Sequence, residues 1–523
     1  MANNPYFDHL PASTKADVRN REVTTDKTSR PNSSSAQNST YELTDIALDN
    51  SKKDDELTTI ALDNSKKDDE LAGIPTVASG EVDYHSMNWW QCGMIMIAET
   101  ISLGILSLPS VLANVGLIPG VILLIGLGVM SSYSGYVMYQ FRQAYPQIES
   151  MAGSIEVLFS LVGMKRFGRE FGAGAYIIFL VFCMASHILT WIICLQTLSS
   201  HSVCNILWGV VGMAIFWVLD IPRTCKKMSY MSIASFASIT TAVVITMVAV
   251  GVEKPAHNQY SLWPKPDLKF REAFLSIANI LFAYGGHVAF FGFMAELRDP
   301  RDFPKSLALL QTCDITMYII VAIVVYIYTG ANVKSPALSS AGVLVSKIAF
   351  GIAIPTVSPP FTHATPPFDH FILSAVKPKA NHPLQIIIAG VIFGHVASKY
   401  IFNRIFASRP HHINTRTRTA TVSWLSITLL LWVIAFIIAL SIPFFNELLG
   451  LVSSLFASWF TFGLPGIFWL CINKGRWTKG YGKILLTLIN GAMMICGAAI
   501  CVIGVYASGT SIRENTTAKS WSC

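Results

Sequence analysis

Glu99 is the residue of this sequence whose type and position most clearly suggest chemistry. It lies inside the apolar run MIMIAETISLGILSLPSVLANVG (94–116), which continues through Ser102, Gly104 and Pro109. A charge at the centre of a membrane span costs roughly 2.5–3.5 kcal/mol on insertion scales, so ionisable groups there are rare and usually functional. Two interpretations stay open: Glu99 binds a proton as part of a transport cycle, or it is a protonated carboxyl hydrogen-bonded between helices.

A second cluster interrupts another apolar run, ANILFAYGGHVAFFGFMAEL (278–297), which places Tyr284, Gly285, Gly286 and His287 in mid-span. Irregular backbone at membrane depth survives only where it is buried in protein or lines a wet cavity. Each cluster alone is explained by a glycine-kinked packing helix. Two interrupted helices five spans apart are instead typical of a secondary transporter with inverted repeats. There, free backbone amides at the breaks bind the anionic group of a substrate.

The other buried polar candidates are weaker. His395 and Lys399 are i,i+4 neighbours on one helical face. Lys399 either neutralises Glu99 or extends its amine to the cytoplasmic edge, and the second interpretation is favoured. We interpret His187 and Asp314 as packing or interface residues. The spans contain no metal-ligand cluster and no nucleophile–base pattern, so the sequence predicts no metal site, no cofactor and no enzyme.

The composition shows which kind of molecule carries these residues. The 523 residues are 52% hydrophobic and 13% charged, against roughly 25% charged for an ordinary soluble protein. Residues 1–85 contain 16 of the 31 acidic residues, and the rest of the chain has a net charge of +14. So few charges cannot cover the surface of a soluble domain of that size. The composition excludes an ordinary soluble enzyme and predicts an all-α integral membrane protein.

The hydrophobic runs predict about 11 transmembrane helices, since a span needs roughly 20 apolar residues. The runs lie near 91–113, 117–141, 173–197, 203–220, 229–252, 272–297, 306–329, 386–406, 421–442, 446–472 and 482–507. The segment 143–172 between the second and third runs predicts an additional interfacial helix on the cytoplasmic side.

The loop charges predict the orientation. With the N-terminus inside, the cytoplasmic loops carry 18 Lys and Arg residues and the outside loops carry 8, as the positive-inside rule requires. The N-terminus is therefore expected in the cytoplasm, and residues 511–523 are expected to form an extracellular tail. In that tail Asn515 begins an Asn-Thr-Thr sequence, which predicts a glycosylation site.

Residues 1–85 read as a disordered cytoplasmic tail, because they are rich in Ser, Thr, Asn, Asp and Lys and poor in aromatic residues. The tail contains a tandem 14-residue repeat, 46–59 and 60–73. Its repeated pairs Lys52-Lys53 and Lys66-Lys67 are possible acceptors for ubiquitin and the endocytic machinery, although solvated linker charge is the favoured interpretation.

At the two interrupted runs the sequence resembles a known family. Residues 89–117, 274–307 and 386–406 resemble the amino acid/auxin permease family, with most similarity to its fungal neutral amino acid permeases. The resemblance extends over 86–510, the expected transmembrane transporter domain. It implies a five-plus-five inverted repeat with broken helices 1 and 6 and one extra C-terminal helix. It also implies proton-coupled uptake of neutral aliphatic and aromatic amino acids.

The resemblance also implies where the substrate binds. Its carboxylate and ammonium groups would lie against Ser102, Leu103, Gly104, Ile105, Tyr284, Gly285, Gly286 and His287. Sodium-coupled relatives have an Asn at about the position of Ala98, so the resemblance favours protons over sodium as the coupling ion. We assign proton coupling to Glu99, with Lys399 and His395 as further candidates.

The sequence therefore predicts a secondary active transporter, a proton symporter that imports neutral amino acids through the lipid bilayer of the plasma membrane. A vacuolar membrane and a vacuolar amino acid exporter are the alternatives within this class. A non-transporting amino acid sensor on the same fold is the alternative from another class. No feature indicates binding to nucleic acid.

Residues 357–385 (VSPPFTHATPPFDHFILSAVKPKANHPLQ) depart from the family pattern. An extracellular gate, a histidine metal site and a disordered extracellular loop are possible interpretations. We favour a fourth, a retained intron. Val357-Ser358 can be encoded by the donor sequence GTAAGT, Gln385 by the acceptor CAG, and Ala380-Asn381 by the branch-point sequence GCTAAC. Messenger RNA that reads continuously across the segment would contradict this interpretation.

Overall fold

The computed structural model describes residues 87–223, 228–255, 259–353, 385–415, 417–515 and 521. The predicted tail 1–85, with its repeat and lysine pairs, lies outside the described residues. Residues 357–384 of the inserted segment also lie outside them.

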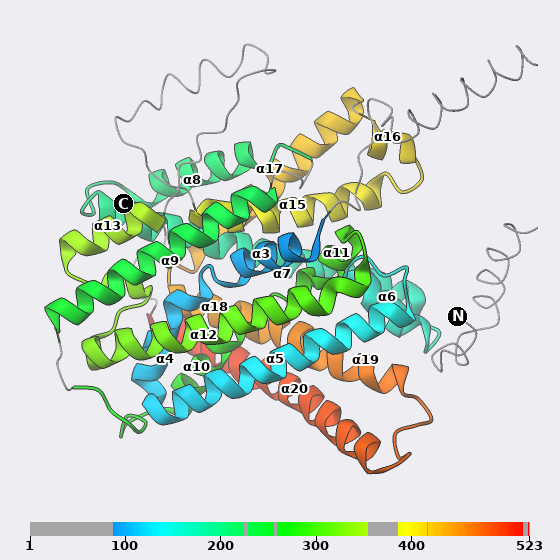
Figure 1. Ribbon diagram of the computed structural model, residues 1–523. Helices are drawn as coiled ribbons and strands as arrows, with labels where there is room; N and C mark the ends of the chain where they lie inside the picture. Colours follow the sequence, from blue (N-terminus) through cyan, green and yellow to red (C-terminus); the bar gives the residue numbers. More distant parts are fainter. Residues whose placement is uncertain are drawn as a thin grey trace, which may run out of the picture. The chain divides into compact units, whose positions relative to one another are not determined.

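Each of the eleven predicted runs coincides with a helix or with a pair of helices separated by a break (Figure 1). In chain order these are α3 (Trp89–Thr100) with α4 (Gly104–Val115), α5 (Leu117–Ala144), α7 (Lys165–Leu198), α8 (Asn205–Leu219), α9 (Met228–Glu253), α10 (Phe270–Ala283) with α11 (His287–Glu296), α12 (Phe303–Thr329), α15 (Gln385–Ile405), α17 (Arg418–Ser441), α18 (Phe445–Val452) with α19 (Leu464–Ile472), and α20 (Tyr481–Asn515).

Shorter elements connect them. Helix α6 (Met151–Ser160) lies in the segment predicted to form an additional helix and confirms that a helix is present there. The Ser150 hydroxyl caps it by accepting a hydrogen bond from the Gly153 N–H at 3.1 Å. Two further short helices are α13 (Val343–Ala353) and α16 (Pro410–Asn414).

The helix lengths confirm an all-helical membrane protein. Among the described residues, eight helices are long and apolar enough to cross a membrane, and the bent pair α3–α4 makes a ninth. The other two predicted runs correspond to α8 and α15. Helix α8 has 15 residues, about 22 Å at 1.5 Å per residue, which is shorter than the roughly 30 Å of a bilayer core. In the described part of the chain, strand pairing is limited to one bridge between Met87 and Leu297.

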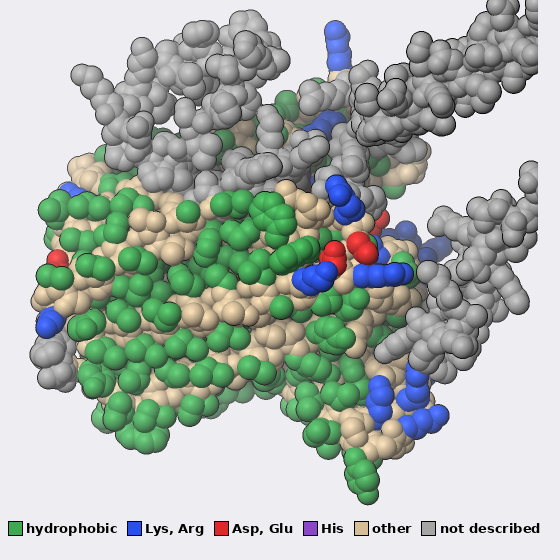
Figure 2. Space-filling model, viewed as in Figure 1, with side chains coloured by type: hydrophobic (Ala, Val, Ile, Leu, Met, Phe, Trp, Pro, Cys, Tyr) green, Lys and Arg blue, Asp and Glu red, His purple; other side chains and the backbone are tan. Residues whose placement is uncertain are grey.

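The outer surface is apolar where lipid would contact it. Figure 2 shows hydrophobic side chains covering the face formed by α5, α9 and α12, while Lys and Arg gather near α6 and the loop from α19 to α20. Val129 of α5 and Val248 of α9 are more than half exposed. Large exposed apolar surfaces of this kind mark contact with membrane or protein partners.

Candidate functional site

The first break lies between α3 and α4, whose axes bend by 51°. The Ile101 N–H closes the last turn of α3 on the carbonyl of Ile97. The N–H groups of Ser102 through Ile105 have no backbone acceptor within the described chain. The start of α4 therefore presents a set of free donors with the positive end of the helix dipole behind them.

The second break lies between α10 and α11. Tyr284 and Gly285 donate their N–H groups to Ile280 and Phe282, which ends α10. The N–H groups of Gly286 through Val288, at the start of α11, have no backbone acceptor in the part of the chain that the structure describes. Gly285 is half-buried, whereas the other residues of this break are buried.

The two breaks touch each other. A Cβ atom added to Gly104 would lie 2.4 Å from the Cα of Ala283, and one added to Gly286 would lie 2.7 Å from the Cγ2 of Thr100. These contacts bring the two predicted clusters together, although about 180 residues of chain separate them. The close approach also explains why both positions lack a side chain.

Tyr318 of α12 holds the two ends of the broken helices. Its hydroxyl lies 3.0 Å from the carbonyl oxygen of Thr100 and 2.8 Å from that of Ala283. These are the last residues of α3 and α10. A phenol has one proton to donate, so the two carbonyl oxygens share it. The C-terminal ends of α3 and α10, which carry the negative ends of the helix dipoles, therefore meet at the Tyr318 hydroxyl.

The side chains of the second break face α5. The Nε2 of His287 lies 2.8 Å from the Oγ of Ser134 and 3.1 Å from the carbonyl oxygen of Ser131. The Tyr284 hydroxyl donates to the carbonyl of Leu124 at 3.1 Å. These two side chains thus anchor the break to α5, and its backbone remains available for a ligand.

Glu99 is buried beside the first break, with 4% of its surface exposed. Neither carboxyl oxygen has a hydrogen-bond partner among the described residues. The described residues therefore do not support the interpretation that Glu99 is a protonated carboxyl hydrogen-bonded between helices. A buried carboxylate without a partner is strongly unfavourable, so the protonated form fits this environment.

Lys399 and His395 have polar contacts elsewhere. The Nζ of Lys399 lies 2.9 Å from the Oε1 of Glu296, and both side chains are partly exposed, so Lys399 does not neutralise Glu99. The Nδ1 of His395 lies 3.8 Å from the Oδ1 of Asp220. The indole of Trp432 donates to the other oxygen of this carboxyl at 3.0 Å.

Glu296 also belongs to a closure at the end of the molecule that bears most of the loop Lys and Arg residues. The Met87 N–H donates to the carbonyl of Glu296 at 3.2 Å, and the Arg298 N–H donates to the carbonyl of Met87 at 2.9 Å. The segment before α3 is thereby paired with the segment after α11. Together with the Lys399 ion pair, this bridge joins the segment before α3, the end of α11 and α15.

We expect Glu296→Gln to favour the state that is open at this end. Exposed ion pairs contribute about 0.2–1 kcal/mol, and 1 kcal/mol changes a population ratio by about fivefold. The measurement is the rate at which a thiol reagent added from that side labels a cysteine introduced at Ala98. The exchanged pair Glu296→Lys with Lys399→Glu should restore the slow rate, and equal rates in all three proteins would contradict a gating role.

One irregular segment was not predicted from the sequence. Between α18 and α19 the chain forms two π-helical stretches, Ser453–Ala457 and Trp459–Gly463. Such stretches are often found at functional sites. A Cβ added to Gly285 would lie 3.6 Å from the Cβ of Ala457, so this segment lies beside the second break. The hydroxyl run Ser453, Ser454, Ser458 and Thr461 inside an apolar span was the available signal.

Aromatic side chains pack around the π-helical segment. The ring of Phe179 on α7 lies 6.1 Å from that of Phe456 and 5.5 Å from that of Phe460, both edge-on. The break and the π-helical segment therefore meet among apolar rings.

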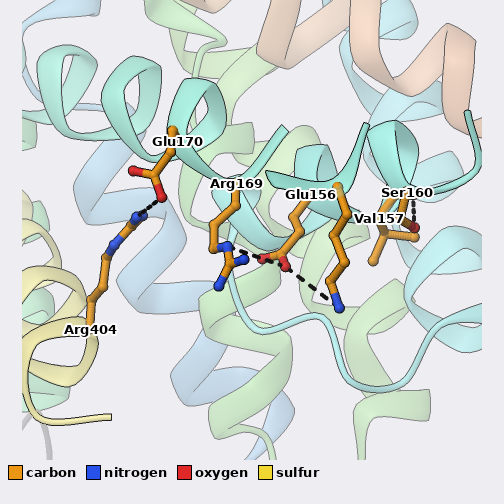
Figure 3. A network of polar contacts seen from close by, with 7 residues as sticks. Glu156, Val157, Ser160, Arg169, Glu170 and Arg404 are labelled. Atoms are coloured by element: carbon orange, nitrogen blue, oxygen red, sulfur yellow. Dashed lines mark hydrogen bonds and ion pairs between the residues drawn. The ribbon is translucent and has the colours of Figure 1, made fainter. Parts of the chain in front are cut away.

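Charged residues form a separate network near α6 (Figure 3). Glu156 of α6 lies 3.8 Å from Arg169 and 3.9 Å from Lys165, both on α7. Arg404 of α15 pairs with Glu170 at 2.5 Å. The first two contacts fasten α6 to α7, and the third joins α7 to α15.

Comparison with known proteins agrees with the sequence resemblance. The family described as transmembrane amino acid transporter protein matches residues 85–357 and 357–510. The N amino acid transport system protein of Neurospora crassa is 32% identical over 463 residues, which cover 86% of this chain and 91% of that protein. A transmembrane transporter of Gibberella moniliformis is 26% identical over 440 residues, which cover 83% of this chain and 85% of that protein.

Among solved structures, a nucleobase-cation-symport-1 family transporter with bromovinylhydantoin bound is 13% identical. That match covers 84% of this chain and 96% of the other, with a TM-score of 0.43.

Proposed function

The chain belongs to the transmembrane amino acid transporter family, and from this premise we propose that it is a proton symporter for neutral amino acids. Transport of amino acids across a membrane follows from the family. The coupling ion, the substrate range and the direction of transport are the proposal. The observation that carries it is the meeting of two broken helices beside the buried Glu99, whose carboxyl oxygens have no hydrogen-bond partner in the described part of the chain.

The breaks offer opposite charges to a zwitterion. Free N–H groups at the start of α4 and α11 suit a carboxylate, because helix N-termini attract anions. The carbonyl oxygens of Thr100 and Ala283, at the ends of α3 and α10, suit an ammonium group. An amino acid bound across the crossing would use both kinds of site, and this supports the substrate-binding role proposed for Ser102–Ile105 and Tyr284–His287.

The surroundings favour a neutral side chain. The rings of Phe179, Phe456 and Phe460 pack together at the π-helical segment, and Ala457 of that segment approaches Gly285 of the second break. Apolar surface stabilises aliphatic and aromatic groups by about 25 cal/mol per Å² removed from water. A cationic side chain would lose its hydration there without gaining a counter-ion.

Glu99 is the proposed site of the coupling proton. In the outward-open state water reaches Glu99, and it binds a proton together with the amino acid. The closed state buries the neutral carboxyl, and opening to the cytoplasm releases the proton. Each charge that moves down the membrane potential supplies about 2.3 kcal/mol per 100 mV, which drives uptake against a gradient.

We propose the plasma membrane as the location, with the N-terminus in the cytoplasm. Cys204, in the loop between α7 and α8, is disulfide-bonded. Disulfides persist in oxidising compartments, which supports the predicted outside position of this loop.

Glycosylation tests the orientation. We expect endoglycosidase to increase the gel mobility of the protein, and Asn515→Gln to remove this shift, since only sequons outside the cytoplasm are modified. Asn38 begins an Asn-Ser-Thr sequence in the N-terminal tail, so Asn38→Gln is the matched control and should change nothing. A shift that depends on Asn38 would reverse the proposed orientation, and a C-terminal tag read as cytosolic would show that the number of spans is wrong by one.

Uptake by a permease-deficient host tests the function as a whole. Labelled neutral, cationic and anionic amino acids are compared at several pH values, with and without sodium. The proposal expects uptake of neutral amino acids that rises at acidic external pH and does not need sodium. A sensor would instead give signalling without uptake, and a vacuolar exporter would give activity in vacuolar vesicles.

A further inference from the structure

A second buried carboxyl lies beside the first break. Asp314 of α12 has no exposed surface. Within the described chain, no Lys, Arg or His forms an ion pair with it. Its Oδ1 lies 3.2 Å from the Oγ1 of Thr100, and its Oδ2 has no partner among the described residues.

The position of Asp314 connects it to both broken helices. Thr100 is the last residue of α3, so Asp314 contacts the end of the helix that carries Glu99. Tyr318 lies one turn further along α12 and bridges the carbonyls of Thr100 and Ala283. The last turn of α3 thus carries one buried carboxyl itself and contacts a second across the helix interface.

The hydrogen bonds of Thr100 indicate which form of Asp314 the site holds. A threonine hydroxyl has one proton and two acceptor lone pairs. The Thr100 hydroxyl has a nearer acceptor than Asp314, since the carbonyl of Met96 lies at 3.0 Å. The Thr100 hydroxyl therefore shares its one proton between the carbonyl of Met96 and the Oδ1 of Asp314. This shared donor is weak support for a buried carboxylate whose Oδ2 has no partner among the described residues, so the carboxylic acid form of Asp314 fits the site better.

None of the described groups around Asp314 supplies a positive charge that could neutralise its ionised carboxylate. The titratable groups that interact electrostatically with Asp314 are the phenols of Tyr284 and Tyr318 and the thiol of the neighbouring Cys313. The hydroxyl of Thr100 is a further polar contact. Tyr284 comes from the second break and Tyr318 from α12. None of these groups is a cation, so nothing in the described site would stabilise the ionised carboxylate.

We propose that Asp314 is a second proton-binding carboxyl of the transport cycle, which rests on the proton coupling proposed above. The proton binds from the outside water when α3 and α12 are apart there. It is buried against Thr100 when the helices close, and it leaves to cytoplasmic water when they separate on that side. The transporter then moves two protons with each amino acid, one on Glu99 and one on Asp314.

The experiment counts protons per amino acid with the full-length protein in liposomes, from the internal pH change and the uptake of labelled substrate. Asp314→Asn is the central variant, because its amide oxygen can accept from Thr100 as the carboxyl does, but the amide cannot exchange a proton. The ratio should fall from about two to about one, since each carboxyl binds one proton. Glu99→Gln should give the same fall, and the double variant should catalyse exchange without proton movement.

Thr100→Val is the matched control. It removes the hydroxyl that donates to the Asp314 carboxyl but leaves the carboxyl, so the ratio should stay at the wild-type value while the pH of half-maximal uptake rises. An unchanged ratio in Asp314→Asn would overturn the proposal. The proposal would also be overturned if the wild type moves one proton per amino acid and Glu99→Gln alone abolishes that movement. In that case the proposed function, proton symport, would still hold. Uptake by the wild type without any proton movement would instead refute the proposed function.

A variant that binds but does not transport is still informative. Calorimetry of the purified protein in two buffers with different ionisation enthalpies gives the protons taken up as the amino acid binds. Asp314→Asn should take up one fewer than the wild type. Loss of substrate binding at every pH would overturn the proposal, because the amide preserves the oxygen that accepts from Thr100.

Discussion

Replacement of Glu99 by glutamine should lower the steady-state accumulation of a neutral amino acid by about 50-fold at a membrane potential of −100 mV. One transported proton supplies about 2.3 kcal/mol at that potential, and 1.36 kcal/mol corresponds to a factor of ten. Glutamine keeps the size and shape of the protonated side chain but cannot exchange a proton. The variant should still exchange internal for external amino acid at close to the wild-type rate, since exchange needs no net movement of charge.

The environment of Glu99 makes the variant a clean test. Neither of its oxygens has a hydrogen-bond partner among the described residues, so the amide breaks no contact of the protonated acid. Folding and membrane insertion should therefore be preserved. Glu156→Gln changes the same functional group on α6, where Glu156 pairs with Lys165 and Arg169, and should leave accumulation unchanged. A Glu99→Gln protein that accumulates substrate like the wild type would show that the coupling proton binds elsewhere.

The sequence predicted the breaks well because the physical signal is local. A carboxyl in an apolar run, and two glycines beside a histidine in another, are visible without any knowledge of the partner helix. Their five-span separation predicted that they belong together, and the contact between Gly104 and Ala283 is the structural counterpart of that prediction.

The partners of these residues could not be predicted in the same way. Tyr318 and Asp314 lie on α12, more than 210 residues after Thr100, and their role depends on which face of α12 meets α3. A tyrosine in an apolar span reads as an ordinary packing residue, and Asp314 near the start of a span reads as an interface residue. Only the packing of α12 against both breaks gives these side chains their contacts.

Lys399 shows the same limit. Its spacing from His395 predicted a shared helical face, but a four-carbon side chain can reach in several directions. The structure places its amine on Glu296, at the end of α11. The sequence favoured an amine that extends to the cytoplasmic edge over one that neutralises Glu99, and neither interpretation named Glu296, because tertiary packing selects the acid that Lys399 contacts.

Gly104→Ala is expected to have the second large effect, because it adds an atom where the two breaks touch. The new Cβ would lie 2.4 Å from the Cα of Ala283 and 2.7 Å from its Cβ. Backbone atoms cannot rotate away, so α4 and α10 must separate. Overpacking of this kind costs about 1–3 kcal/mol, which corresponds to about a 5- to 150-fold loss of substrate affinity if the closed site bears the cost.

The measurement is the concentration for half-maximal uptake, together with the amount of protein in the membrane. Gly126→Ala on α5 is the matched control, since a Cβ there meets no atom within 4 Å. That change should leave uptake unchanged and stabilise the helix slightly, because alanine favours helix by about 1 kcal/mol over glycine. Adding Ala283→Gly to Gly104→Ala should recover part of the lost affinity by removing one of the two clashing atoms. Wild-type affinity in Gly104→Ala alone would mean that the breaks do not close on the substrate as this contact requires.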